Sequence, residues 1–490
     1  MFKHTFKIFS AIILISLTSL QAQNYNDAIR LGFPGLGSNA RALGMGNAFN
    51  ALSDDASASY FNPAGFGLIK KMELSGGLSF NNFDNTTTLF GNETQDNNTN
   101  TSLNRISFAL PFPTYQGSLV FGLSYHQSKD LSGIVKFDGF NAGNNSWIRH
   151  FALKNSDLLY NTKLSYPLWG YDPEVNDTVW LKDTTNIFGN LNQSGNTLTS
   201  GSIDNWTFSG AIEVEKNFFI GGSLTVINGS FESLRDYYED DINNSYNNTL
   251  ELYPGNPLTR DFQSFYFNPT TKWDIGGWNA KIGFLYQLED YARFGATVQF
   301  PKTYSITEEY SEYAQSKFAN SQFEYFYDDE VSYDIITPFE LNGSFAINFK
   351  GLILSGEATF IDYSQITFAN LEGYEDPAFV KSVNLKDIKD LLTSVLNYNV
   401  GFEYTVPTVG LRVRGGFMSQ PSPFDGDDFD FAHKYITGGL GYLANGKIGI
   451  DIAYAYGWWK DIGDNYDNNV SRTYQDIKNS TVMVTTTYRF

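Results

Sequence analysis

The chain has no cysteine, only four histidines and few prolines among its 490 residues. Without cysteine it can form neither disulfide bonds nor thiolate metal sites, and it cannot be anchored as a lipoprotein. No G-x-S-x-G or H-E-x-x-H pattern is present, which removes the familiar serine-hydrolase and zinc-protease arrangements. We therefore expect no enzymatic activity and no cofactor. A lipase or protease with an unfamiliar triad is the alternative that these absences leave open.

Basic residues and long hydrophobic runs are scarce as well. Thirty-three lysines and arginines face 53 acidic residues, for a net charge of −20, which argues against nucleic-acid binding. The first 22 residues combine Lys3 and Lys7 with an apolar run over 8–20 and the small Ala22, which predicts a secretory signal peptide cleaved after Ala22. Beyond it, no apolar run is long enough for a membrane helix.

Glycine, aromatic and small polar residues are abundant instead, and they alternate with period two. In 205–214, for example, Trp206, Phe208 and Ile212 share one face and polar residues share the other. Segments of about ten residues suit tilted strands that cross a bilayer. The pattern recurs in segments 72–80, 104–112, 117–127, 205–214, 218–230, 278–288, 293–303, 337–348, 352–363, 395–406, 409–419, 434–443, 448–458 and 480–490. This predicts an all-β fold, a transmembrane antiparallel β-barrel of about 14 strands with both termini in the periplasm.

Short connections alternate with long ones, as in outer-membrane barrels with short periplasmic turns and long external loops. Asn445-Gly446 is the strongest hairpin signal among the short ones. The long polar segments lie at 81–103, 128–204, 231–277, 304–336, 364–394, 420–433 and 459–479. Segment 156–166 also alternates, but an even strand number places it in a loop. A soluble secreted β-sandwich is the alternative fold, with shorter loops.

The carboxy-terminal run ends on Phe490, with Val482, Val484 and Tyr488 on the same face. It resembles the signal that the barrel-assembly machinery reads. We expect that machinery as a partner during biogenesis and the Gram-negative outer membrane as the location, where the barrel is a monomer.

Residues 41–68 show neither strand nor helix periodicity. Small residues allow close packing there, and Asn62-Pro63 followed by Ala64-Gly65 fixes an irregular path. We expect residues 23–70 to form a plug inside the barrel and residues 71–490 to form the barrel itself.

The alternation also predicts charged side chains that face the lumen, among them Arg105, Arg412, Arg414 and Glu403, and it turns Lys281 inward as well. Arg412 and Arg414 lie across a short turn from the strand of Glu403, so an ion-pair network is expected; anchoring of a ligand carboxylate by one arginine is the functional alternative. Outside the barrel, an amphipathic helix is expected over 376–395.

Four aspartates cluster at 425–430 in an expected external loop: Asp425, Asp427, Asp428 and Asp430. They form no complete calcium-loop signature, so a solvated acidic loop is preferred to a calcium site, and no metal ligand is assigned.

Taken together, these residues resemble the FadL/TodX (OMPP1) family of outer-membrane transporters for hydrophobic compounds. The most specific match is the plug, from Gly44-Met-Gly-Asn-Ala-Phe49 through Asn62-Pro-Ala-Gly65. Weaker matches are 280–284, 293–297, 356–364 and 412–417. The resemblance implies uptake of hydrophobic molecules such as long-chain fatty acids or aromatic hydrocarbons, with Asn62, Pro63, Ala64 and Gly65 in a movable hatch. It also implies lateral release through the barrel wall into outer-membrane lipid.

Two alternatives to this function stay open. The run Asn39-Ala-Arg-Ala-Leu-Gly-Met-Gly46 also resembles the outer-membrane shuttle of the type IX secretion system, which would make the partner a secreted protein. A general porin is the other alternative, although a plug argues against an open pore.

Overall fold

The structure is a computed structural model that describes most of the chain. The residues outside its description are 1–24, 155, 173–175, 248–249, 375 and 467–468. The predicted signal peptide lies outside the described residues and stays a prediction.

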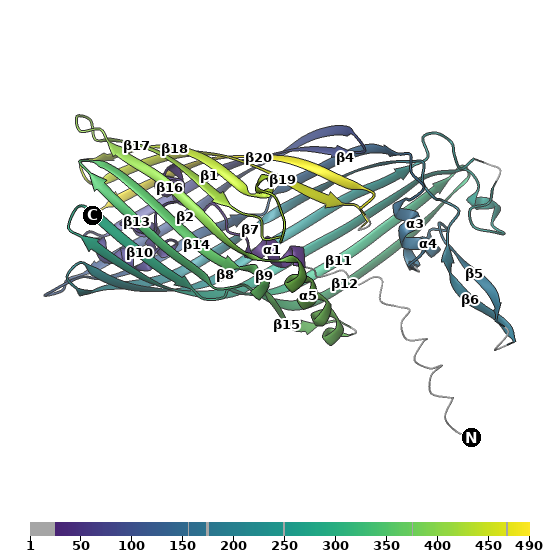
Figure 1. The fold of residues 1–490 in the computed structure, drawn as a ribbon, viewed down its shortest axis with the longest axis horizontal. Coiled ribbons are helices and arrows are strands. Elements are labelled where there is room, and N and C mark those ends of the chain that lie inside the picture. Colours follow the sequence, from purple (N-terminus) through teal and green to yellow (C-terminus); the bar gives the residue numbers. More distant parts are fainter. Residues whose placement is uncertain (1–24, 155, 173–175, 248–249, 375, 467–468) are drawn as a thin grey trace, which may run out of the picture.

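The strands form one antiparallel sheet that closes on itself (Figure 1). The first strand, β1 (Glu73–Leu89), pairs with β2 (Asn92–Phe112) on one side and with the last strand, β20 (Arg472–Arg489), on the other. Four strands bend into two segments each, namely β3–β4, β10–β11, β12–β13 and β14–β15. The eighteen segments of the sheet therefore make a barrel of fourteen strands, as the sequence predicts.

The other elements follow along the chain. The remaining strands are β3 (Leu119–Asp130), β4 (Gly133–Asn141), β5 (Tyr166–Asp172), β6 (Asp177–Thr184), β7 (Leu191–Glu215), β8 (Phe218–Asp240), β9 (Phe262–Leu288), β10 (Ala292–Gln299), β11 (Thr303–Phe318), β12 (Ser321–Ile336), β13 (Glu340–Phe349), β14 (Leu352–Asp362), β15 (Thr367–Glu372), β16 (Ser394–Thr405), β17 (Leu411–Gln420), β18 (His433–Ala444) and β19 (Ile448–Asp464). The helices are α1 (Tyr25–Gly32), α2 (Ala40–Gly44), α3 (Trp147–Ala152), α4 (Asp157–Asn161) and α5 (Pro377–Leu391), with short 3-10 turns η1 (Ala56–Ser59), η2 (Pro63–Leu68), η3 (Pro257–Thr259), η4 (Tyr363–Gln365) and η5 (Phe429–Phe431).

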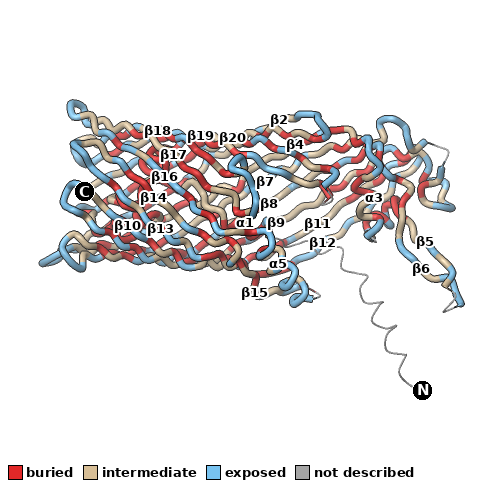
Figure 2. The backbone as a smooth tube through the Cα atoms, in the orientation of Figure 1, coloured by how far each residue is buried: buried red, intermediate tan, exposed pale blue. Residues whose placement is uncertain are grey.

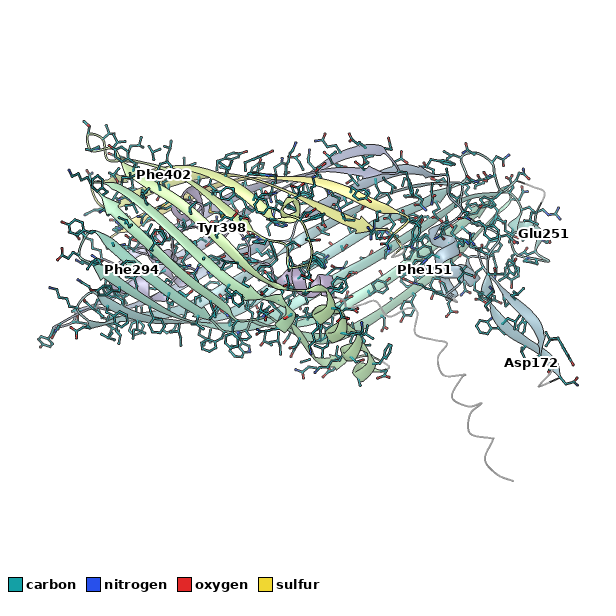
Figure 3. The ribbon with its side chains drawn as sticks, viewed as in Figure 1. Phe151, Asp172, Glu251, Phe294, Tyr398 and Phe402 are labelled. Atoms are coloured by element: carbon teal, nitrogen blue, oxygen red, sulfur yellow. The ribbon has the colours of Figure 1, made fainter. Side chains whose placement is uncertain are left out.

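The short turns lie at one end of the barrel, together with the carboxy terminus (Figure 1). Asn445 and Gly446 both have positive φ there, as a tight hairpin requires. Next to these turns, apolar side chains such as Phe294, Tyr398 and Phe402 point outward and are exposed (Figure 3). Such an exposed apolar belt around a barrel fits contact with the hydrocarbon of a membrane. No helix among the described residues is long and apolar enough to cross a membrane.

Beyond the belt, much of what the sequence analysis took for long loops is strand. The hairpin of β1 and β2 reaches Leu89 and Asn92, and β8 runs on to Asp240. The expectation of loops was wrong here because the outer side of these strand parts meets water and carries polar residues, while the inner side mixes apolar with polar residues, so the apolar alternation weakens. We call these parts of β1, β2, β4, β7, β8, β9, β11, β12, β19 and β20 the extension.

Two smaller expectations are settled by the same elements. Segment 156–166 contains α4 and not a barrel strand, as its placement in a loop predicted. The helix expected over 376–395 is α5, which begins after Asp376, whose side chain accepts from the backbone N–H of Phe379.

Two large apolar clusters lie in the interior. Figure 2 shows in red the positions along the backbone where residues are buried. The one in the extension surrounds α3 and α4 and includes Trp147, Leu159 and Phe265. The other lies deeper and receives α1, whose Ala28 and Leu31 are buried against Trp273 and other strand residues. The interior is therefore packed, not open.

Candidate functional site

The residues from Tyr25 to Leu68 run inside the barrel, and we call them the luminal segment. Its hydrogen bonds reach strands far away in the sequence: the N–H of Ala40 donates to Thr485, that of Gly46 donates to Thr437, and that of Phe49 donates to Glu357. Contacts with so many strands hold an irregular chain in one path. The luminal segment thus occupies the interior of the barrel and is bonded to its wall.

Asparagine and aspartate side chains fix the turns of this path. Asn39 accepts from the N–H of Arg41 at the start of α2 and donates to Ser57 at 2.7 Å. Asn62 accepts from the N–H of Ala64 at 3.0 Å, and its amide donates to the carbonyl of Phe284 on β9 at 3.0 Å. Each of these asparagine side chains thus caps a short helix and also binds a second element. Both tasks require a polar side chain, although the positions follow neither a helix nor a strand period.

Glycines in the wall let the luminal segment approach closely. A Cβ on Gly283 of β9 would collide with the side chain of Asn62, and one on Gly221 of β8 would collide with the backbone around Pro63 and Ala64. The Asn62–Gly65 turn, predicted as part of the hatch, therefore sits directly against two adjacent strands.

A buried ion network ties the luminal segment to β16 and β17. Arg41 donates to both oxygens of Glu403, at 3.0 and 3.1 Å, and to Asp54 at 2.5 Å. Arg414 binds Glu403 at 2.7 Å and Asp451 at 2.7 Å. Two guanidinium groups therefore share one carboxylate, and Glu403 is 2% exposed, so these two partners supply its direct charge compensation.

The other predicted luminal charges lie outside this network. Arg105 is buried and donates to Ser107 at 2.8 Å, but no carboxylate pairs with it among the described residues. Arg412, next along β17 from Arg414, is half-buried and likewise makes no ion pair with a described residue. Of the four, the structure brings together only Arg414 and Glu403. The sequence analysis missed Arg41 and Asp54, since a segment without periodicity gives no sign of which side chains meet the wall.

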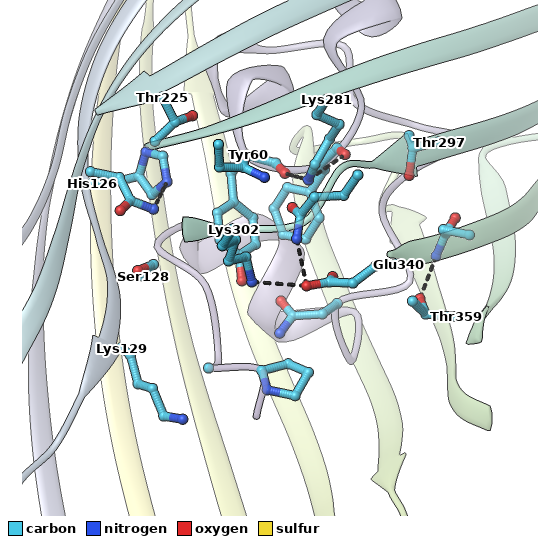
Figure 4. A pocket seen from close by; sticks show the side chains of 18 of the residues that line it. Tyr60, His126, Ser128, Lys129, Thr225, Lys281, Thr297, Lys302, Glu340 and Thr359 are labelled. Atoms are coloured by element: carbon cyan, nitrogen blue, oxygen red, sulfur yellow. Dashed lines mark hydrogen bonds and ion pairs between the residues drawn. The ribbon is translucent and has the colours of Figure 1, made fainter. Parts of the chain in front are cut away.

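A cavity of about 160 Å³ lies between the luminal segment and the wall (Figure 4). Its lining includes Lys129, Lys281 and Lys302. Lys302 pairs with Glu340 at 2.8 Å, whereas Lys281 donates to the carbonyl of Tyr60 at 2.6 Å and Lys129 donates to the carbonyl of Phe33 at 2.7 Å. Two of the three lysine side chains are thus held by neutral carbonyl oxygens, while Glu340 and Glu357 line the same cavity.

Part of the cavity lining is apolar. Leu31, Ile203 and Ile227 line the cavity and belong to the apolar cluster around α1. Apolar side chains next to lysine and glutamate side chains make an amphipathic environment. None of these positions was proposed as a site from the sequence, although the alternation marked Lys281 as facing inward.

The barrel wall is interrupted between β2 and β3. Their backbone pairing runs from Phe112 and Leu119 up to Arg105 and His126, and no ladder pair joins them above that point among the described residues. Side chains bridge the interruption instead, as in the bond from Ser102 to Gln127 at 2.6 Å. A backbone irregularity between Gln127 and Lys129 marks the same place in β3.

A second cavity, of about 170 Å³, lies behind this interruption. Its lining combines Phe33 to Gly37 of the luminal segment with polar side chains of β2 and β3, among them Asn104 and Gln127. Gly35 touches the carbonyl of Ser128 so closely that a Cβ there would collide with it. The luminal segment thus covers the inner side of the wall interruption.

The acidic loop at 425–430 has another role in the structure. Asp430 pairs with Lys460 at 2.8 Å, and Asp427 accepts from Ser422 at 2.5 Å. No group of three or more possible metal ligands occurs in the part of the chain that the structure describes.

Several solved structures have a fold similar to that of this chain. No protein-family model and no curated sequence matches the chain. The structure of a FadL homologue from Pseudomonas aeruginosa matches with a TM-score of 0.58 at 14% identity, over 94% of this chain and 100% of that one. That of the toluene transporter TodX from Pseudomonas putida matches with a TM-score of 0.54 at 12% identity, over 93% and 99%. The chain therefore has the FadL/TodX-type fold, a fourteen-stranded barrel with an amino-terminal segment inside, and this prediction is confirmed.

Proposed function

We propose that the protein is an outer-membrane transporter for the uptake of hydrophobic molecules. The observation that carries this proposal is the full-length likeness to barrels whose described roles include toluene transport. The packed lumen supports it, because a general porin needs an open aqueous path and an apolar molecule gains nothing from one. The proposal includes a cleaved signal peptide, a monomeric barrel in the Gram-negative outer membrane, and assembly by the barrel-assembly machinery.

The interior favours an amphipathic cargo with an anionic head. Apolar side chains around Leu31 and Ile227 suit a hydrocarbon chain, and Lys129 and Lys281 suit a carboxylate, since neither lysine has a carboxylate partner among the described residues. The sequence analysis considered Arg414 as an anchor for a ligand carboxylate, but Arg414 already forms ion pairs with Glu403 and Asp451. A long-chain fatty acid fits this environment better than a plain aromatic hydrocarbon.

The luminal segment acts in this proposal as a hatch that moves. Asn62 to Gly65 lie against β8 and β9, and Gly35 lies behind the wall interruption of β2 and β3. Displacement of this segment would join the two cavities and open the interruption sideways. Cargo would then leave into the outer leaflet of the membrane without crossing water.

The first test is native mass spectrometry, with lipid extraction, of the detergent-purified protein after incubation with mixed fatty acids and aromatic hydrocarbons. A retained fatty acid supports the importer, and it should be lost when Lys129 and Lys281 are both replaced by glutamine. Lys460→Gln, which removes an exposed charge, is the matched control. A bound secreted protein without any hydrophobic ligand would favour the secretion shuttle instead.

A further inference from the structure

The extension ends on one side at a strand whose outer edge is unpaired. β12 pairs with β11 along its whole length, but on its other side it meets β15 only from Ser332 to Ile336. Among the described residues, no strand pairs with positions 321–331 on that side, although the backbone of Gly373 lies against Glu330 and Val331, and α4 contacts β12. Half of the N–H and C=O groups over these positions therefore face outward without a strand partner, as at the edge of any open sheet.

The side chains of this edge alternate sharply. Phe323 and Tyr325 pack on the apolar cluster inside the extension, and they hold the strand in place. Its outer face exposes one amide, one aromatic and three acidic side chains: Gln322, Phe326, Glu324, Asp328 and Glu330. Phe326 is 64% exposed, which is unusual for a phenylalanine in water.

Phe326 is the last member of an aromatic strip that crosses four strands. Tyr238 of β8 stacks on Tyr266 of β9 with ring centroids 4.8 Å apart, and Tyr266 meets Tyr313 of β11 at 6.0 Å. Tyr313 is the direct ladder partner of Phe326. The strip thus runs to the free edge and stops there, where the next strand would continue it.

This strip faces water outside the membrane. Charged side chains point outward between it and the apolar belt, including the pair of Lys272 with Glu232 at 3.3 Å and the exposed Glu309. Hydrocarbon would not tolerate these charges. A partner of the edge is therefore an extracellular one.

A second copy of the chain is a poor partner. Two copies joined edge to edge around Phe326 would place Glu324 of each opposite Asp328 of the other, and like charges opposite each other destabilise a sheet. The acidic residues therefore block self-association and select a basic strand.

We propose that the free edge of β12, residues 321–331, binds an extended basic segment of another polypeptide outside the cell. The segment adds a strand to the sheet through its backbone. It places an aromatic side chain beside Phe326 and lysine or arginine beside Glu324, Asp328 and Glu330. This site is independent of the transport proposed above, because it lies on the outer wall and not in the lumen.

The test uses the detergent-purified full-length protein and a short synthetic peptide that alternates lysine with threonine and carries one tyrosine in the lysine register. We expect binding by fluorescence anisotropy, and slower hydrogen exchange of amides within 321–331 when the peptide is present. The same peptide N-methylated along its central backbone keeps its charge but cannot pair, so it should bind about tenfold more weakly or not at all.

Charge-reversal variants separate recognition at the edge from general attraction. Asp328→Lys with Glu330→Lys should weaken binding of the lysine peptide about tenfold and admit a peptide with glutamate in place of lysine. Asp425→Lys with Asp427→Lys makes the same charge change on an exposed loop and should leave binding unaltered. Equal binding of the N-methylated peptide, or protection outside 321–331, would overturn the proposal, as would the absence of any binding. Because cargo retention is not measured here, failure of this site leaves the transport proposal standing.

Discussion

At the scale of single residues, Glu403 is the side chain that we expect to contribute most to holding the luminal segment against the barrel wall. Glu403→Gln leaves Arg41 and Arg414 buried without a counter-charge on β16. We expect this change to reduce the free energy that holds the luminal segment against the barrel wall by about 3–5 kcal/mol. Limited proteolysis should then cleave the luminal segment, while the heat-modifiable mobility of the barrel on gels stays normal.

An exposed ion pair supplies the control for this change. Asp430→Asn removes a partner of Lys460, and an exposed pair of this kind contributes little to stability. Its proteolysis pattern should match that of the unmodified protein. Resistance of the Glu403→Gln luminal segment to protease would mean that other contacts hold it in place.

Asn62 offers a milder change at the same scale. Asn62→Ala removes the cap on Ala64 and the bond to Phe284, a loss of about 1–2 kcal/mol that loosens the hatch turn. Uptake of a labelled fatty acid by whole cells should change, and Pro63→Ala should act in the same direction. Normal barrel assembly on gels is the expected control result. If both variants assembled and transported normally, the hatch role of this turn would be refuted.

These residues also show how far sequence reasoning reaches. Glu403 and Arg414 could be placed on one luminal face because the strand period fixes side-chain direction. Arg41 could not be placed, because the path of an irregular segment depends on contacts with strands hundreds of residues away. Lys281 was predicted to face inward, but its importance comes from a neighbour, Tyr60, that no spacing indicates.

At the scale of elements, α3 depends on one buried carboxylate in the extension. Glu239 accepts from the N–H groups of Trp147 and Ile148 at the start of α3, and from Tyr237 and Gln193. Burial in the extension, beyond the apolar belt, raises the pKa of Glu239 to about 7 from an ordinary value of 4.5. The folded state therefore holds this proton more tightly than the unfolded state.

The sign of the pH effect follows from that difference. The contribution of Glu239 is fully present below pH 4.5 and is lost as pH rises to about 7, so the docking of α3 should weaken over this window. Hydrogen exchange of residues 147–152, corrected for its intrinsic pH dependence, measures the effect. Glu239→Gln, which cannot titrate, should flatten the profile. A profile that keeps its slope in that variant would assign the effect to another group.

The last strand allows a separate prediction for assembly. The N–H of Phe490 bonds to the carbonyl of Met72, and its ring meets Tyr488 edge-on at 4.8 Å, next to the β1–β20 seam. Deletion of Phe490 should lower the yield of heat-modifiable barrel in the outer membrane, with little effect on uptake per assembled molecule. Reduced uptake at full yield would contradict this division of roles.

The sequence predicts some elements better than others, and the reason is physical. Every strand part that faces the belt was predicted, because lipid outside and polar atoms inside impose period two. The extension was not, because β7 from Leu191 to about Ile203 and the outer half of β9 meet water on the outside. The apolar alternation weakens where the outer face carries polar residues and the inner face mixes polar with apolar ones, even though the backbone ladder continues.

At the scale of the whole molecule, the luminal segment should prevent ions from flowing through the barrel. The protein in a planar bilayer should show no steady ion current, because packed clusters and the luminal segment fill the lumen. Deletion of residues 25–68 should produce open-channel conductance. The Asp430→Asn protein serves as the control for purification and insertion. Steady current through the unmodified protein would favour the general porin and refute the hatch.

The placement of an amino-terminal segment within a barrel that its own chain completes also has a kinetic consequence. The N–H of Ala40 bonds to Thr485 across 445 residues, and that of Gly46 bonds to Thr437 across 391 residues. Contacts of such long sequence separation form late and slowly. On the export route proposed above, the first part of the chain to reach the periplasm is therefore among the last to find its native contacts. We expect it to need shelter from periplasmic proteases until the final strands are in place.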